Sequence, residues 1–113
     1  MAQPHVQSGQ VVSVRALGES LAGARTTALL KAEQLEVVRV VLPAGSAMRE
    51  HKTPGELTVQ CIEGRIEFTT PAASHVLEAG DFIHLRGEEP HALRAVRDSS
   101  ALVTICLLPR NAD

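Results

Sequence analysis

Two histidines of this chain, His51 and His91, each follow a glycine that is expected to form a turn. His51 lies six positions after Gly45, and His91 lies eleven positions after Gly80. Imidazole is the commonest metal ligand in proteins, and it can also orient a ligand by hydrogen bonding. We expect the two side chains to meet in a pocket between two sheets, where they ligate a metal or serve as polar anchors.

The elements that must position these histidines are short β-strands. Apolar, β-branched and alternating segments recur at regular spacing, separated by turn residues, and this pattern is typical of an all-β sandwich or barrel. We predict one domain over residues 1–113, with a barrel core at about 28–108 and a flexible tail at 1–9. The predicted strands are 11–17, 28–31, 35–42, 57–62, 65–69, 74–77, 82–85, 91–96 and 101–108, with a tight hairpin turn at Glu63-Gly64. A short helix is the alternative for the segment 24–35, whose residues also have helix propensity.

Composition argues against two classes of partner. The net charge is −2 with no basic stretch, and the chain has no Trp or Tyr and only two Phe. Nucleic-acid binding normally needs a basic surface or aromatic stacking platforms, and membrane interfaces favour Trp and Tyr. Arg39 interrupts the longest apolar run, so we expect no membrane span.

The two cysteines, Cys61 and Cys106, both lie in apolar strand-like segments. Free cysteine is among the most buried residue types, so we expect buried, reduced thiols, with a disulfide as the alternative. Residues 1–10 lack the basic and apolar regions of a secretory signal. Both features favour a cytoplasmic location.

The stretch from Gly45 to Gly64 has the form G-x5-H-x-T-x3-L-x6-G. It resembles the first signature of the cupin superfamily, and the stretch from Gly80 to His91 resembles the second. The resemblance is to a small, RmlC-like cupin and covers roughly residues 30–108. It implies a double-stranded β-helix, which is a jelly-roll-like barrel, and frequent dimerisation.

The departures from the cupin signatures affect the metal site. Metal-binding cupins typically use two histidines and a carboxylate from the first signature and one histidine from the second. Thr53 here stands at the second histidine position and Leu57 at the carboxylate position. Only His51 and His91 remain, whereas catalytic zinc and non-haem iron sites generally need about three protein ligands. The candidates for a further ligand are Gln60, His84 and Glu56.

Strand alternation predicts which other side chains share the pocket. We expect it to be lined mainly by His51, Thr53, Leu57, Val59, Cys61, His91 and Leu93, together with Ala95. Gln60 and Glu56 share the opposite parity, so they face inward only if a bulge shifts the register after Gly55. The phase of His84 stays open.

The expected function is binding of a small molecule in the barrel pocket, with a weakly held divalent metal (Zn, Ni, Mn or Fe) as a possible cofactor. One alternative is a metal-dependent cupin enzyme of the dioxygenase, isomerase or decarboxylase type that uses His51 and His91. Another is a structural dimer with a vestigial site. We expect a homodimer, because the aliphatic segments 11–17 and 35–42 offer more apolar surface than one thin barrel can bury.

Overall fold

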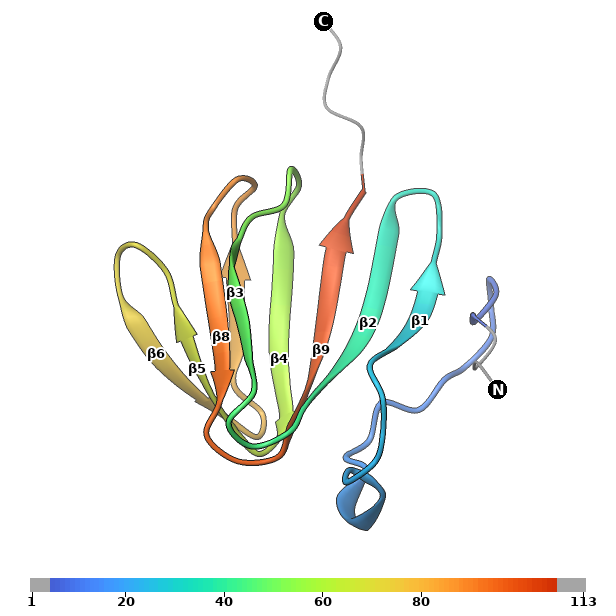
Figure 1. The fold of residues 1–113 in the computed structure, drawn as a ribbon. Coiled ribbons are helices and arrows are strands. Elements are labelled where there is room, and N and C mark those ends of the chain that lie inside the picture. Colours follow the sequence, from blue (N-terminus) through green and yellow to red (C-terminus); the bar gives the residue numbers. More distant parts are fainter. Residues whose placement is uncertain (1–4, 108–113) are drawn as a thin grey trace, which may run out of the picture.

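The computed structural model describes residues 5–107 and shows two antiparallel sheets facing each other (Figure 1). The only helix in these residues is a single 3-10 turn, η1 (Gly18–Ser20). No helix in the described part of the chain is long and apolar enough to cross a bilayer. The prediction of an all-β fold is confirmed.

The larger sheet has five strands in the order β1-β2-β9-β4-β7. Its central strands carry the β-branched and aliphatic residues that favour a half-buried pleated surface. The bounds are β1 (Thr27–Lys31), β2 (Leu35–Leu42), β9 (Ser99–Cys106), β4 (Leu57–Glu63) and β7 (Phe82–Leu85).

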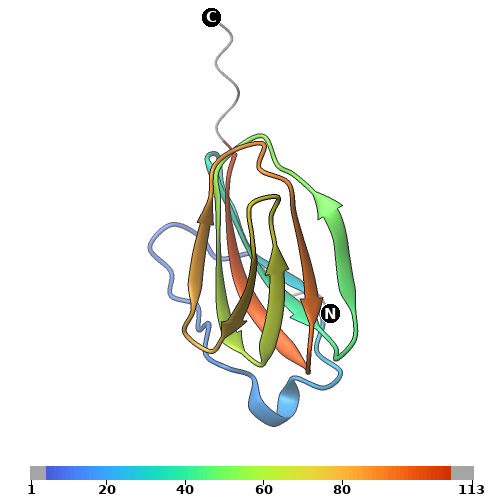
Figure 2. The same ribbon diagram turned by 90° about the vertical axis from the view of Figure 1, so that its left-hand side faces the viewer.

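The smaller sheet has four strands in the order β3-β8-β5-β6. Figure 2 shows it beside the larger sheet, with the blue N-terminal segment outside the sandwich. The bounds are β3 (Ala47–His51), β8 (His91–Ala95), β5 (Arg65–Thr69) and β6 (Ser74–Glu78).

The core lies between the sheets and follows the period-two alternation of the strands. In β4, Leu57, Val59 and Cys61 are buried, and they meet Ile66 and Phe68 of β5 in the same hydrophobic cluster. The interior therefore rests on aliphatic packing around one phenylalanine. Cys61 and Cys106 are free thiols, as predicted, although Cys106 is only half-buried.

Eight of the nine predicted strands are present, with ends that differ by at most two residues where the structure describes them. The predicted end at Leu108 and residues 1–4 of the predicted tail lie outside the described residues. Within that tail, the Val6 N–H donates to the Leu29 carbonyl of β1 at 2.8 Å. One strand, β3, was not predicted, because its sequence AMREH is polar and it pairs only with β8.

The prediction of a strand at residues 11–17 is wrong. This segment has no strand partner. It lies against the outer face of the larger sheet, where Arg39 alternates with the inward-facing Val38 and Val40. Side chains hold it there: the Glu63 carboxylate accepts from the Leu17 N–H at 2.9 Å, and Arg39 donates to the Ser13 carbonyl at 3.5 Å. Alternating valines produce the sequence pattern of a strand, but a strand also needs a hydrogen-bonded neighbour.

The predicted hairpin at Glu63-Gly64 is also wrong, although the turn itself is real. β4 and β5 belong to different sheets, so the turn carries the chain across the sandwich. Gly64 has a φ of 92°, and a Cβ there would overlap Ser99 and the Asp98 carbonyl. Glycine is therefore required both for the backbone conformation and for the close approach.

Candidate functional site

His51 and His91 lie directly opposite each other, at the end of β3 and the start of β8. The pairing register shifts between Met48 and His51, and this irregularity brings the two histidines into register. Their ring centroids are 4.3 Å apart with an interplanar angle of 59°. Opposite residues of an antiparallel pair project to the same face, so both imidazoles occupy one site.

A backbone carbonyl fixes the orientation of each ring. Nδ1 of His51 lies 3.0 Å from the Arg49 oxygen, and Nδ1 of His91 lies 3.0 Å from the Glu89 oxygen. A carbonyl oxygen only accepts hydrogen bonds, so Nδ1 carries the proton in each neutral ring. The Nε2 lone pair is then the free basic position of both imidazoles.

The environments of the two rings differ. His91 is only 3% exposed, and its ring stacks on Phe68 at a centroid distance of 5.7 Å. Burial lowers the pKa of His91 below its ordinary value, and the neighbouring His51 acts in the same direction, although the hydrogen bond to Glu89 opposes them. His51 is exposed at the mouth of the site. Burial therefore favours the neutral form of the inner imidazole.

The two histidines line a cavity of about 230 Å³ between the sheets. Its walls are mostly aliphatic, and no Asp, Glu, Lys or Arg of the described residues lines it. The lining residues are Thr26, Val38, Val40, Met48, His51, Thr53, Leu57, Val59, His91, Leu93, Val103 and Ile105. This combination of apolar walls and a few polar groups is typical of ligand sites.

Most of the residues expected from strand alternation do line this cavity. Cys61 and Ala95 do not, because both are fully buried in the core farther along their strands. The pKa of the Cys61 thiol is raised, first by burial and then by nearby carboxylates. Sequence reasoning missed Thr26, Val38, Val40, Met48, Val103 and Ile105. The alternation of Val38 with Val40 does predict that both side chains face inward. It does not indicate that they lie at the end of the barrel that contains the cavity.

Two loops form the rim of the cavity beside the histidines, at the upper end of Figure 1. The Glu88 N–H donates to the Thr53 carbonyl at 2.7 Å, which links residues 52–56 to residues 86–90. A Cβ at Gly87 would overlap the Pro54 carbonyl oxygen, so the loops approach as closely as a glycine allows. Thr53 donates its hydroxyl proton to the Gly55 carbonyl at 3.0 Å, which leaves the oxygen free to accept.

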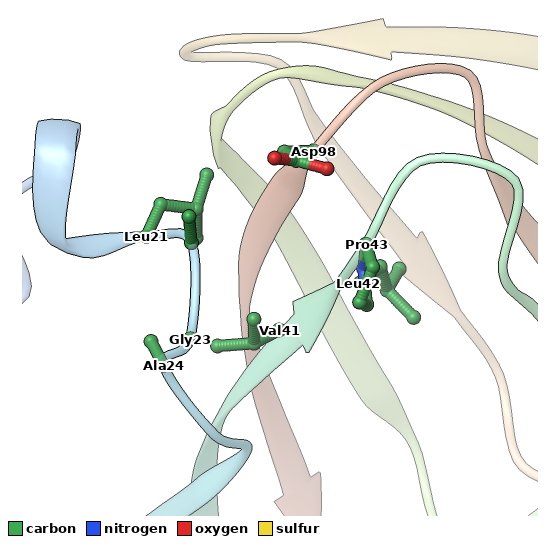
Figure 3. Close-up of a pocket in the computed structure, with 8 residues that line it drawn as sticks. Leu21, Gly23, Ala24, Val41, Leu42, Pro43 and Asp98 are labelled. Carbon is green, nitrogen blue, oxygen red and sulfur yellow. The ribbon is translucent and has the colours of Figure 1, made fainter.

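A second hollow, of about 220 Å³, lies between the segment that follows η1, the end of β2 and Asp98 (Figure 3). Leu21, Val41 and Pro43 form part of its wall, and Asp98 is its only ionisable side chain among the described residues. An oxygen of Asp98 already accepts a hydrogen bond from the Ala44 N–H at 2.8 Å. This hollow therefore offers less chemistry than the histidine cavity.

Residues 38–108 match the family described as Cupin domain, which covers more than half of the sequence. The chain belongs to the cupin family. The predicted resemblance is thereby confirmed. No curated protein matches the sequence.

Similar solved structures include two that are named as cupins. A cupin superfamily protein from Desulfitobacterium hafniense superposes with a TM-score of 0.74 at 13% identity, over 94% of this chain and 97% of the other. An RmlC-like cupin from Desulfovibrio desulfuricans superposes with a TM-score of 0.66 at 27% identity, over 90% of this chain and 97% of the other. A DMSP lyase from Ruegeria pomeroyi gives 0.65 at 28% identity, over 72% of this chain but only 42% of that one.

The additional metal ligands considered for this cupin do not reach the histidine pair. β4 pairs with β7 in continuous register from Leu57 to Gln60, so no bulge turns Gln60 inward. His84 lies opposite Thr58 on the outer face, where its Nε2 is 2.7 Å from a Glu56 oxygen. Within residues 5–107, no three His, Cys, Asp or Glu side chains are grouped to hold a metal ion. The site has two imidazole ligands and does not fit a tightly held resident metal.

Proposed function

We propose that this cupin binds a small, largely apolar organic molecule in the cavity between its sheets, with His51 and His91 as polar anchors. The observation that carries the proposal is the cavity between the sheets, which is lined mostly by aliphatic side chains and contains two imidazoles with free Nε2 atoms. Drug-sized ligand pockets occupy about 300–1,000 Å³. At about 230 Å³, the cavity suits a smaller ligand, of the size of one substituted six-membered ring.

Filling the cavity tests this function. Val103 lines the cavity from β9, so Val103→Phe places an aromatic ring in the ligand space. Val37→Phe is the matched control, because Val37 alternates with the inward-facing Val38 on β2. Toluene added to ¹⁵N-labelled wild-type protein should shift amide signals of β4 and β8. The same shifts should disappear in Val103→Phe and persist in Val37→Phe. Unchanged wild-type spectra would refute the function.

The histidine pair also supports weak binding of a divalent metal such as Zn, Ni, Mn or Fe. Two neutral imidazoles supply lone pairs, and water would have to complete the shell. Calorimetric titration with Ni²⁺ should give modest affinity that falls as the pH is lowered, because only neutral imidazole ligates and protons compete with the metal. Combining His51→Ala with His91→Ala should abolish the binding. Nanomolar affinity of the wild type would contradict a two-ligand site, and equal binding by the double variant would place the metal elsewhere.

The alternative of a metal-dependent enzyme has less support from the residues of this site. Similar structures include a DMSP lyase and a salicylate 1,2-dioxygenase. A metal-dependent reaction of this general kind needs about three protein ligands, and Gln60, Glu56 and His84 face away from the cavity. We therefore favour ligand binding without metal catalysis over the enzyme.

A further inference from the structure

The polar groups of the cavity are nearly all hydrogen-bond acceptors. Both imidazoles use their Nδ1 protons on backbone carbonyls, and the Thr53 hydroxyl uses its proton on the Gly55 carbonyl. The groups left for a ligand are therefore two Nε2 lone pairs and one hydroxyl oxygen. A ligand that bonds at this end of the cavity must supply the protons.

One hydroxyl in the lining has a proton to offer. Thr26 accepts a hydrogen bond from the Val41 N–H at 2.9 Å, which leaves its own proton free. It precedes β1 in the larger sheet, whereas both histidines belong to the smaller sheet. Donors and acceptors of the cavity thus lie on opposite sheets, and the histidine side remains an acceptor surface.

The cavity also lacks a counter-charge for an ionic ligand. The nearby charged side chains pair with each other outside it, as Arg86 does with Glu89 at 3.0 Å and Lys52 with Glu88 at 3.5 Å. Transferring a carboxylate or an ammonium group into apolar surroundings without a paired charge is costly. A neutral ligand avoids this cost.

We infer that the ligand is a neutral molecule with an apolar body and an O–H or N–H group that donates to Nε2 of His51 or His91, as a phenol or a small alcohol does. This inference rests on the proposed function, because it assigns the ligand class of the same cavity. The inference therefore distinguishes ligands of equal size and hydrophobicity by whether they can donate a hydrogen bond. A carboxylate or an ether of equal size should bind less well.

Phenol, anisole and benzoate test the inference as a matched series. Phenol donates a proton, anisole replaces that proton by a methyl group, and benzoate is an anion. The measurement is titration followed by ¹⁵N chemical shifts in EDTA at pH 8, where phenol is un-ionised because its pKa is about 10. Phenol should bind about tenfold more tightly than anisole, as one hydrogen bond to an otherwise unpaired acceptor predicts, and benzoate should bind most weakly.

Variants locate the acceptor. His91→Phe keeps an aromatic ring against Phe68 but removes the lone pair, so the preference for phenol over anisole should fall towards one. His51→Ala provides a second variant at an exposed position, in case the buried substitution impairs folding. His75→Ala is the control, because His75 is an exposed residue of β6 outside the cavity. It should retain the full preference.

The outcomes distinguish the two proposals. Binding of phenol and anisole with equal affinity would support a ligand cavity and overturn the donor requirement. Tighter binding of benzoate would overturn it as well. Failure of all three probes to bind would overturn the proposed function, and the ligand class with it. A phenol preference that is lost in either histidine variant and kept in His75→Ala would establish the inference, and a preference kept in both histidine variants would overturn it.

Discussion

Glu63 should stabilise this fold far more than its place in a surface turn suggests. Its carboxylate accepts hydrogen bonds from the Leu17 N–H at 2.9 Å, the Gly18 N–H at 3.1 Å and the Ser100 hydroxyl at 2.5 Å. It thereby attaches the N-terminal segment to the outer face of the larger sheet. The perturbation is Glu63→Gln, which preserves shape but removes the charge and one acceptor oxygen.

The expected loss follows from these contacts. Hydrogen bonds to charged groups contribute about 1.5–3 kcal/mol and neutral ones about 0.5–1.5 kcal/mol. A glutamine oxygen in place of Oε2 keeps two of the bonds without their charge assistance, at about 1 kcal/mol each. Taking the lower end of the range for charged bonds, because Glu63 is only half-buried, we expect Glu63→Gln to lower the free energy of unfolding by about 2.5 kcal/mol. In urea this should shift the midpoint by about 1 M.

The control is Glu67→Gln. Glu67 forms an exposed ion pair with Arg94 at 3.1 Å, and such pairs contribute about 0–1 kcal/mol. Both variants lose one negative charge from the same part of the chain, so the difference between them isolates the hydrogen bonds. Equal destabilisation of the two variants would refute the reasoning.

Acid provides an independent readout of the same contacts. Burial by itself raises the pKa of Glu63, but its three hydrogen bonds and the positive charge of Arg39 outweigh burial and lower the pKa below the ordinary 4.5. The stabilisation by the ionised Glu63 carboxylate is therefore complete above about pH 4.5. It is lost as the pH falls through the lower pKa of Glu63 in the folded state. The gap in unfolding free energy between wild type and Glu63→Gln should narrow over this window. A constant gap would show that the charge has no such role.

Three further predictions concern the turn, the inner histidine and self-association. Gly64→Ala should reduce the free energy of unfolding by about 1–3 kcal/mol, because φ is 92° and a Cβ would meet Ser99; a change below 0.5 kcal/mol in urea denaturation would be inconsistent with this. Because the pKa of His91 is lowered in the folded state, the unfolded chain binds more protons below about pH 6.5. The free energy of unfolding of the wild type should therefore decline from about pH 6.5 down to the lower pKa of the folded state. His91→Phe should show a flatter dependence of this free energy on pH, and parallel dependences would exclude His91 as the cause. Sedimentation should give a homodimer at micromolar concentration, and a monomer would contradict the expected partner.

Local pattern was sufficient to predict most strands and the histidine pair. The alternation of Leu57 and Val59 with polar neighbours predicts which face of β4 is buried, because side chains alternate strictly between the two faces. The turn glycines mark strand ends, since Gly64 must adopt a positive φ. The resemblance of the segments around His51 and His91 to the cupin signatures indicated a shared pocket, and the structure places both rings in one cavity.

The tertiary structure determined which strands pair and which distant residues meet. Local pattern cannot determine this, because the same periodicity is compatible with many strand pairings. It placed β4 and β5 in different sheets and left residues 11–17 without a strand partner. It also kept Gln60 on the outer face and paired Glu56 with His84, 28 residues away. Arg39, which only interrupts an apolar run in the sequence, is 93% buried beneath the N-terminal segment. Each of these outcomes depends on contacts between distant parts of the chain, whereas alternation and turn chemistry depend only on near neighbours.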